Sequence, residues 1–502
     1  MNFKEKIKQN KWNIIITLIY AIVTFIITIF FHEKWRDEAQ AWLIARDLDI
    51  FGIIKQMSYE GHPPLWHLIL MPFAKLGFPY ITESIISWVI MVIAVWILVN
   101  KSPFNKETKI LIILTSPFIY LYPSISRNYC LIPLALALIA MYYPKRKEKM
   151  LGYCLSVLFL AYTHVLMLAM AGLLFLFYFV DEVFYIKKTK EEKKKLIKVL
   201  AISVIGLICL FLILVGSTSK NTQIPLNSEH NTVNINRVKL LITAMQGKLF
   251  GIIVNYIGFK VYFYAFIILL IIWQARKNIE NFIITVFSIF WQIYIYLFIN
   301  DADGQKTCIL ILIFIFIAWI NHYKENEKIN SKNTEIWNNI IKKGIMVLLI
   351  LNSMVGINEI SLEVEKIYSN AKYTADFINA NTEKDSIFVC ANPSTMSAII
   401  PYTQNKKFWN PTSEEFFTYI TWNQASITYL NADEIIEKTQ KYFNAKDNIY
   451  FIISNKHIGI QENNITKLQK ENLLSKNIYK DSDNTILRDE NFTIYKINLQ
   501  EK

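Results

Sequence analysis

An acidic pair, Asp37 and Glu38, follows the first long apolar run of the chain, in the stretch FHEKWRDEAQAWLIARD (31–47). An ionised carboxylate beside a lipid region can act as a general base on an acceptor hydroxyl group. The same pattern is typical of a helix start, with Asp37 as the N-cap of an interfacial helix that lies on the membrane. The positive end of a helix dipole keeps such a carboxylate ionised, so the two interpretations are compatible.

A second polar group lies further along the same segment, in EGHPPLWH (60–67). His62 can donate a hydrogen bond to a phosphate or transfer a proton near neutral pH. Pro63 and Pro64 fix the backbone and can open a helix at its first turn. The stretch therefore predicts either a rigid entry to a second interfacial helix or a loop that holds His62 and Glu60 beside the acidic pair.

Three later side chains could bind a phosphate: Arg127 in SRNY (126–129), His164 in AYTHVLML, and Lys306 in NDADGQKT. A guanidinium group suits bidentate phosphate binding, although an Arg at this place could also be a cation that extends to the membrane surface. His164 is either a second phosphate donor or a polar group inside a helix bundle. NDADGQKT predicts a turn, from which Lys306 could still reach a phosphate.

Long apolar runs must position these residues. Hydrophobic residues make up 53% of the chain, and runs of about 18 apolar residues or more are typical of membrane spans. We expect an all-α polytopic membrane protein with about eleven transmembrane helices. The run from 151 to 180 is too long for one span and predicts two, with a turn at 162–164. The expected spans are 12–31, 81–99, 109–123, 129–143, 151–162, 163–186, 197–215, 252–273, 279–299, 307–322 and 343–357.

Lys and Arg residues concentrate in every other loop, which predicts a cytoplasmic N-terminus. The net charge of +13 thus reflects topology and does not indicate a nucleic-acid partner. Three long segments are then extracytoplasmic, at 32–80, 216–251 and 358–502. We expect a multi-pass protein of the cell membrane, and the abundance of Ile, Lys and Asn favours a bacterial source.

Two domains are expected: a transmembrane catalytic domain over 1–357, with the first outer loop at 32–80, and an extracytoplasmic α/β domain over 358–502. SIFVCA, NIYFIIS and FTIYKIN predict strands in the second domain. The five Cys residues have no disulfide or metal-site spacing. Histidines beside Asp37 could hold a divalent cation, but no ligand spacing supports such a site.

The ordered set of DE, GHPPLWH and SRNY resembles the multi-spanning C-type (GT-C) glycosyltransferases. The branch it resembles includes bacterial relatives of the protein O-mannosyltransferases and the lipid A aminoarabinose transferases. The motifs that carry this resemblance lie within residues 1–180, and the rest of the chain matches only in architecture. The chain lacks the β-trefoil insertion of eukaryotic protein mannosyltransferases, and the cationic motif of a later loop is reduced to DADGQK.

The resemblance implies an inverting membrane hexosyl- or pentosyltransferase that uses a polyprenyl-phosphate sugar. Asp37 matches the family's catalytic base and Glu38 its partner. His62, Pro63 and Pro64 match the element that shapes the donor site. Arg127 matches the Arg that holds the lipid phosphate, with His164 and Lys306 as possible helpers. The acceptor would be an extracytoplasmic lipid, cell-wall glycan or protein, with no certain cofactor.

Two other classes stay open. A transporter or flippase for a lipid-linked sugar would place charged or broken helices at mid-membrane, whereas here the ionisable groups cluster toward one face. A structural or binding protein that acts through its C-terminal segment would tolerate the loss of Asp37 and Arg127.

Overall fold

The chain forms two compact units in the computed structural model. Unit 1 comprises 1–28, 84–218 and 223–360, and unit 2 comprises 29–83, 219–222 and 361–502. The structure describes residues 3–185, 189–218, 235–250, 278–299, 303–323, 332–423, 430–444, 447–454, 460 and 462–499.

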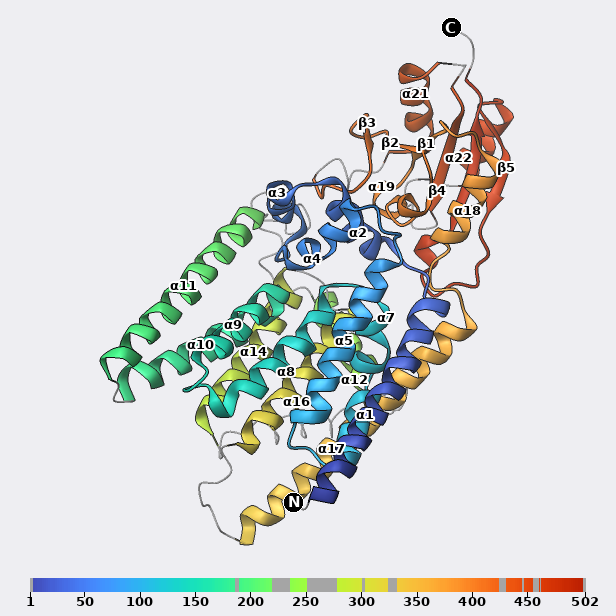
Figure 1. Cartoon of the computed structure of the whole chain (residues 1–502). Coiled ribbons are helices and arrows are strands. Elements are labelled where there is room, and N and C mark those ends of the chain that lie inside the picture. Colours follow the sequence, from blue (N-terminus) through green and yellow to red (C-terminus); the bar gives the residue numbers. More distant parts are fainter. Residues whose placement is uncertain are drawn as a thin grey trace. The chain divides into compact units, whose positions relative to one another are not determined.

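Unit 1 is a bundle of apolar helices (Figure 1). The last five residues of α17, Ser361–Glu365, belong to unit 2. The principal helices of this bundle are α1 (Phe3–Ile26), α5 (Thr82–Lys101), α6 (Lys106–Leu114), α8 (Leu131–Tyr142), α9 (Met150–Thr163), α10 (Leu168–Val180), α11 (Lys190–Thr218), α12 (Ile235–Phe250), α14 (Ile279–Phe298), α16 (Ile309–His322) and α17 (Lys332–Glu365).

Within the described part of the chain, seven helical segments are long and apolar enough to cross a membrane. This agrees with the predicted multi-pass membrane protein. The expected span at 252–273 lies outside the described residues, and the count of eleven stays a prediction. The seven segments are Lys11–Phe31, Thr82–Lys101, Val165–Phe184, Lys190–Leu214, Ile279–Phe298, Gly304–His322 and Lys343–Glu365.

Two predicted features of the spans have different outcomes. The turn expected at 162–164 is confirmed, because α9 ends at Thr163 and His164 has extended backbone angles (φ −159°, ψ 145°). The segment expected as a span at 109–123 is helical but interrupted, and its crossing of the membrane stays a prediction. α6 ends at Leu114, and Pro117 starts a new helical segment, since proline cannot supply the N–H that continues a helix.

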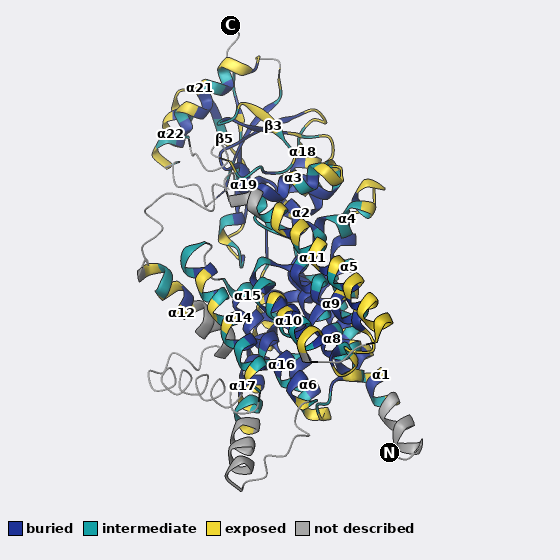
Figure 2. Ribbon diagram, turned by 90° about the vertical axis from the view of Figure 1, so that its left-hand side faces the viewer, coloured by how far each residue is buried: buried dark blue, intermediate teal, exposed yellow. Residues whose placement is uncertain are grey.

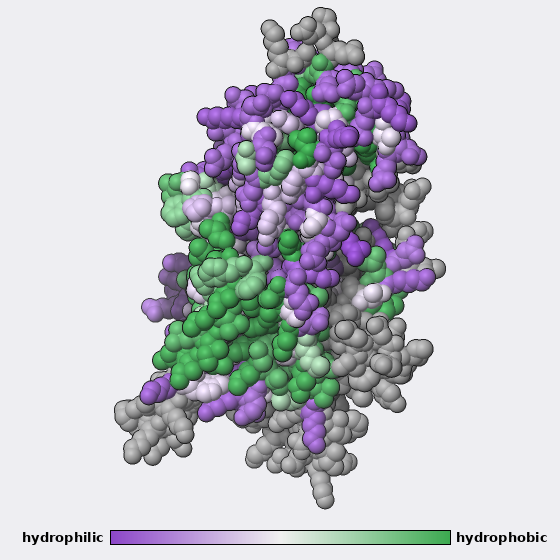
Figure 3. All heavy atoms as spheres, turned by 90° about the vertical axis from the view of Figure 1, so that its right-hand side faces the viewer, coloured by the Kyte–Doolittle hydropathy of each residue, from purple (hydrophilic) through white to green (hydrophobic). Residues whose placement is uncertain are grey.

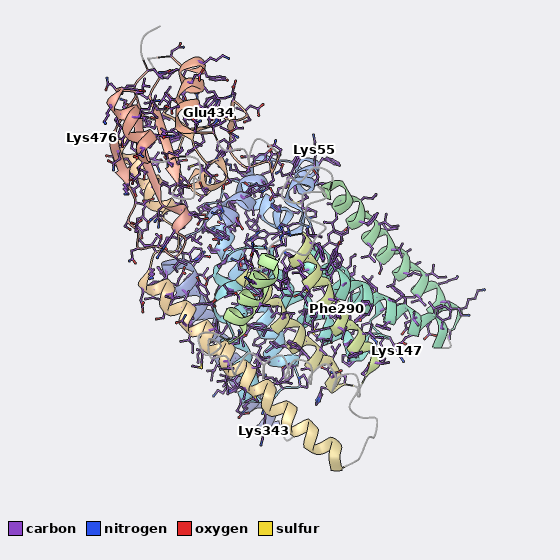
Figure 4. All side chains as sticks on the ribbon, turned by 180° about the vertical axis from the view of Figure 1, so that it is seen from behind. Lys55, Lys147, Phe290, Lys343, Glu434 and Lys476 are labelled. Atoms are coloured by element: carbon purple, nitrogen blue, oxygen red, sulfur yellow. The ribbon has the colours of Figure 1, made fainter. Side chains whose placement is uncertain are left out.

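Burial separates the inner helices of unit 1 from the outer ones. α8 and α16 are mostly buried (Figure 2), whereas α1 exposes a row of large apolar side chains that includes Ile15, Leu18 and Ile22. Figure 3 shows hydrophobic side chains gathered over one face of the spans. Phe290 on α14 is 65% exposed and lies on the outer surface of the bundle (Figure 4). Such surfaces are stable where lipid replaces water.

Unit 2 contains three helices from the first loop: α2 (Arg36–Asp47), α3 (Ile50–Glu60) and α4 (Leu65–Lys75). α2 packs against α4. Residues 38–45 of α2 are all buried within the protein. The placement of this helix at the membrane surface stays a prediction.

A six-stranded mixed sheet forms the rest of unit 2, in the order β3-β2-β1-β4-β6-β5. Its central strands β2, β1 and β4 are parallel, and the outer pairings are antiparallel. The three predicted strands are confirmed as β1, β4 and β6. The bounds are β1 (Ile387–Cys390), β2 (Lys407–Asn410), β3 (Glu415–Phe417), β4 (Ile449–Ser454), β5 (Leu474–Lys480) and β6 (Phe492–Ile497).

Helices α21 (Ala432–Tyr442) and α22 (Glu462–Lys470) supply apolar residues to the core of the sheet. Val389 and Phe451, on neighbouring parallel strands, share this core with Ile435 of α21 and Leu468 of α22. Alternate residues of a strand point to opposite faces, so one face of β1 and β4 is covered by these helices.

Candidate functional site

The acidic pair lies in the first turn of α2, and its two carboxylates have different roles there. Trp35 is the N-cap residue, and the Glu38 carboxylate accepts a hydrogen bond from the Trp35 backbone N–H at 3.2 Å. This is the reciprocal half of a capping box. The prediction that Asp37 is the N-cap is therefore wrong: Asp37 is the second residue of the helix, and Glu38 is the carboxylate that caps it.

Glu38 is also part of a buried charge cluster. His32 Nε2 lies 3.0 Å from Glu38 Oε2, and His32 Nδ1 lies 2.7 Å from Glu363 Oε1 at the end of α17. All three side chains are fully buried. Burial alone would lower the pKa of His32, but the two carboxylates outweigh it and raise the pKa to about 10. The imidazolium is thus the counter-ion of two buried carboxylates, and Glu38 has a structural position.

Asp37 is the carboxylate of the pair that meets solvent. Its side chain is 28% exposed, and its Oδ1 lies 3.8 Å from Nε of Arg36. Arg36 also binds Asp489 Oδ2 through Nη1 at 2.6 Å and donates its backbone N–H to Glu490. The first turn of α2 is thereby tied to the segment before β6, with Asp37 left at the surface of unit 2. A base must reach its substrate, which favours Asp37 over Glu38 for that role.

The turn between α3 and α4 has the geometry that its sequence predicts. Gly61 ends α3 in the left-handed region (φ 69°), which glycine adopts without steric cost. Pro64 is the N-cap residue of α4, which begins at Leu65. The predicted opening of a helix by Pro63 and Pro64 is confirmed. His62 is half-buried within this turn.

Glu60, at the end of α3, lies in a cluster of amides. Its Oε1 accepts hydrogen bonds from Nε2 of Gln40 at 2.9 Å and Nε2 of Gln56 at 3.1 Å. The negative charge of Asp37 acts on the same carboxyl group. Gln40 lies one helical turn after Asp37 on the same face of α2, so its hydrogen bond joins Glu60 to the face of α2 that contains Asp37. That the loop holds His62 beside the acidic pair stays a prediction.

In unit 1, Arg127 and His164 both contact the ring of Tyr129. The Arg127 guanidinium carbon is 5.4 Å from the Tyr129 ring centre, and the Tyr129 and His164 rings stack at 4.9 Å. Asn128 donates its side-chain amide to the Thr163 backbone carbonyl at 2.9 Å, which fixes the two segments together. The structure thus brings two of the predicted phosphate-binding residues into one stack.

The tautomer of His164 follows from its backbone contact. Its Nδ1 accepts a hydrogen bond from the Leu166 N–H at 3.1 Å. A ring nitrogen that accepts a hydrogen bond holds no proton, so Nε2 holds the proton of the neutral ring. His164 can therefore act as a hydrogen-bond donor through Nε2.

Lys306 joins this group through a one-turn helix. The predicted turn is instead α15 (Gly304–Thr307), where Asp303 is the N-cap and its side chain accepts the Lys306 N–H. Lys306 Nζ forms an ion pair with Asp303 Oδ2 at 2.8 Å. The Tyr122 hydroxyl group donates to the Gln305 carbonyl at 2.9 Å, and the Tyr122 ring stacks on Tyr129 at 5.8 Å. α15 is thus linked to the Arg127 stack.

The predicted site residues therefore form two groups. Asp37, Glu38, His62, Pro63 and Pro64 belong to unit 2, and Arg127, His164 and Lys306 belong to unit 1. Among the described residues, no cluster of His, Cys, Asp and Glu has the arrangement of a metal site. A divalent cation at Asp37 stays a prediction from the sequence.

Comparisons with known proteins decide the fold. No protein-family model and no curated protein sequence matches the chain. It is similar to the crystal structure of ArnT from Cupriavidus metallidurans bound to undecaprenyl phosphate, with a TM-score of 0.51 and 10% sequence identity over 97% of this chain and 98% of that one. The chain has the ArnT fold. An apo structure of ArnT matches over the same shares, with a TM-score of 0.47 and 9% identity.

The likeness to ArnT confirms the predicted fold class, a polytopic helical protein with a small C-terminal sheet, and the count of eleven spans stays a prediction. Sequence reasoning missed Glu363 and Gln40, whose partners are remote in the chain. Glu363 lies 331 residues from His32, and Gln40 lies 380 residues from Ile420, whose backbone it binds. No motif or periodicity links residues so far apart, so no local signal could have found these pairs.

Proposed function

We propose that this protein is an inverting glycosyltransferase that moves a sugar from a polyprenyl-phosphate donor to a hydroxyl group of an extracytoplasmic acceptor. The observation that carries the proposal is the ArnT fold, found in a structure that holds undecaprenyl phosphate. The half-buried Asp37 and the stack of Arg127, Tyr129 and His164 support it, because they supply a base and phosphate-binding groups.

In this proposal Asp37 takes the proton of the acceptor hydroxyl group. The acceptor oxygen attacks the anomeric carbon from the face opposite the phosphate, and the bond from that carbon to the phosphate oxygen breaks. The sugar is joined to the acceptor with inverted configuration, and polyprenyl phosphate leaves with both electrons of the broken bond. Asp37 then releases its proton to solvent.

Arg127, His164 and Lys306 are proposed to act on the leaving phosphate. Negative charge grows on that group as the bond breaks, and fixed donors around it lower the barrier. Arg127 offers two parallel N–H donors and His164 offers Nε2–H. The Arg127 guanidinium group lies near the Tyr129 ring, which holds it in place through a cation–π contact.

Glu38 enters the proposal as a positioning residue. It caps α2 and pairs with His32, and both contacts fix the backbone from which Asp37 projects. His62, Pro63 and Pro64 would shape the donor site, since they form the rigid turn that follows Glu60.

The test is reconstitution of the full chain in lipid nanodiscs with a panel of undecaprenyl-phosphate sugars and with candidate glycan, lipid and peptide acceptors. We expect release of undecaprenyl phosphate and a product whose anomeric configuration, read by NMR, is opposite to that of the donor. A retained configuration would contradict direct displacement. In proteoliposomes, movement of the intact donor across the bilayer without release would identify a flippase instead.

A further inference from the structure

Two glutamine side chains of the first loop hold a backbone segment of the C-terminal part of unit 2. The Gln40 amide donates to the Ile420 carbonyl at 2.6 Å and accepts the Ile420 N–H at 2.9 Å. Gln56 donates to the same carbonyl at 3.1 Å. Gln40 and Gln56 are both buried, so these bonds are shielded from water. Ile420 is therefore fixed, and Trp422 follows two residues later.

The same two amides fix the Glu60 carboxyl group. Both donate to its Oε1, which sets the plane of the group and turns Oε2 away from the amides. Trp422 lies within hydrogen-bonding reach of this carboxyl group. Burial raises the pKa of Glu60 to about 7, with a further rise from the charge of Asp37, against the lowering effect of the Gln40 and Gln56 bonds.

Partial exposure is common to three residues of this region: Glu60, Trp422 and Asp37. Each is half-buried, whereas the two glutamines that support them are buried. Because Glu60 and Trp422 are not closed off completely from the surface, a bound molecule can contact them. An indole face beside carboxyl groups complements a sugar ring, which has an apolar face and several hydroxyl groups.

We propose that Glu60 and Trp422 form a saccharide subsite beside Asp37, in which the Trp422 indole packs on a sugar ring and the Glu60 carboxyl group hydrogen-bonds its hydroxyl groups. The first loop and the C-terminal part of unit 2 then build the subsite together. Assigning this sugar to the acceptor rests on the proposed function, because Asp37 is the base there. Glu60 and Trp422 are specificity-determining residues in this account.

The test uses the full chain in nanodiscs, labelled with 5-fluorotryptophan and observed by ¹⁹F NMR. Trp422→Phe assigns the Trp422 resonance, and the probes are the methyl glycosides of glucose, mannose, galactose and N-acetylglucosamine. We expect at least one glycoside to shift this resonance in a saturable way. The resonance of Trp319, a buried residue of α16, should not move. No shift with any of the four probes would overturn the subsite.

Two variants test the role of each side chain. At pH 8, above the pKa of Glu60, Glu60→Gln should weaken binding of that glycoside by about tenfold or more, since hydrogen bonds to a charged carboxylate become weaker bonds to a neutral amide. The exposed Glu471→Gln should leave binding within about twofold of wild type. Trp422→Leu, measured by calorimetry, should abolish binding while Gln40 and Gln56 keep their contacts. Unchanged binding in both site variants would overturn the proposal.

Transfer kinetics separate this proposal from the proposed function. If transfer occurs, Glu60→Gln should raise KM for the acceptor and leave KM for the undecaprenyl-phosphate sugar unchanged. A rise in the donor KM alone would overturn the assignment to the acceptor. Glycoside binding without any transfer would contradict the proposed function and support the subsite, whereas transfer without glycoside binding would contradict the subsite alone.

Discussion

The replacement of His32 by alanine tests the structure at its most buried charge cluster. His32 lies within 3.0 Å of both the Glu38 and the Glu363 carboxylate groups, and no atom of the three side chains is exposed. The variant leaves two buried carboxylates without their cation. Removing one partner of a buried ion pair costs about 3–5 kcal/mol, so we expect a loss of that size in the free energy of unfolding.

The assay is reversible unfolding in lipid–detergent bicelles, followed by tryptophan fluorescence. His322→Ala is the matched control, because His322 is an exposed histidine at the end of α16 and its loss should change stability by less than about 0.5 kcal/mol. Adding Glu38→Gln to His32→Ala should recover part of the loss, since one unpaired charge is removed. A His32→Ala variant within about 1 kcal/mol of wild type would refute the cluster as a source of stability.

The pH dependence of this effect has a defined sign. The pKa of His32 is raised from 6.5 to about 10, so the folded state binds the proton more tightly than the unfolded state does. The stabilisation is complete below the unfolded pKa and is lost as the pH rises through about 10. The stability difference between wild type and His32→Ala should therefore shrink between about pH 7 and pH 10. A difference that stays constant over this range would contradict a protonated His32.

Two further predictions concern glycine packing and a second ion pair. Gly356→Ala should destabilise the protein by about 1–3 kcal/mol, because the new Cβ would lie 2.7 Å from Ile119 Cγ2 and 2.9 Å from a backbone oxygen. Gly172→Ala, in open space within α10, should be neutral or stabilising by up to about 1 kcal/mol in the same unfolding assay. Arg36→Ala should cost about 3 kcal/mol or more, since it strips the buried Glu490 of its cation, while the partly exposed Asp489→Asn should cost less than about 1 kcal/mol. If Arg36→Ala and Asp489→Asn lose the same free energy of unfolding, the burial of Glu490 does not determine the size of the loss.

Local sequence signals predicted the elements that depend on local physics. Apolar runs located the spans, and the strand-like runs NIYFIIS and FTIYKIN located β4 and β6, because β-branched and aromatic residues favour strands. The start of α4 after Pro63 and Pro64 followed from the backbone angle that proline favours. Pro117 shows the opposite case: the apolar run around it continues, but the helix does not.

The candidate site was predictable as a set of residues and not as contacts. The acidic pair was correctly singled out, but its cap was assigned to Asp37, because a capping box with Trp35 as the N-cap has no usual residue type at that place. The partners that distinguish Glu38 from Asp37 are His32 and Glu363. Glu363 lies 331 residues from His32 in the chain, so only the tertiary structure shows the pairing.

The central claim is that Asp37 is the base of a polyprenyl-phosphate sugar transferase. The most direct measurement is the initial rate of undecaprenyl phosphate release in nanodiscs by wild type, Asp37→Asn and Asp47→Asn, with Asp47 as an exposed aspartate at the end of the same helix. We predict that Asp37→Asn loses about 10²–10⁴-fold in rate with unchanged thermal stability, while Asp47→Asn keeps the wild-type rate. Equal rates for wild type and Asp37→Asn would contradict the claim.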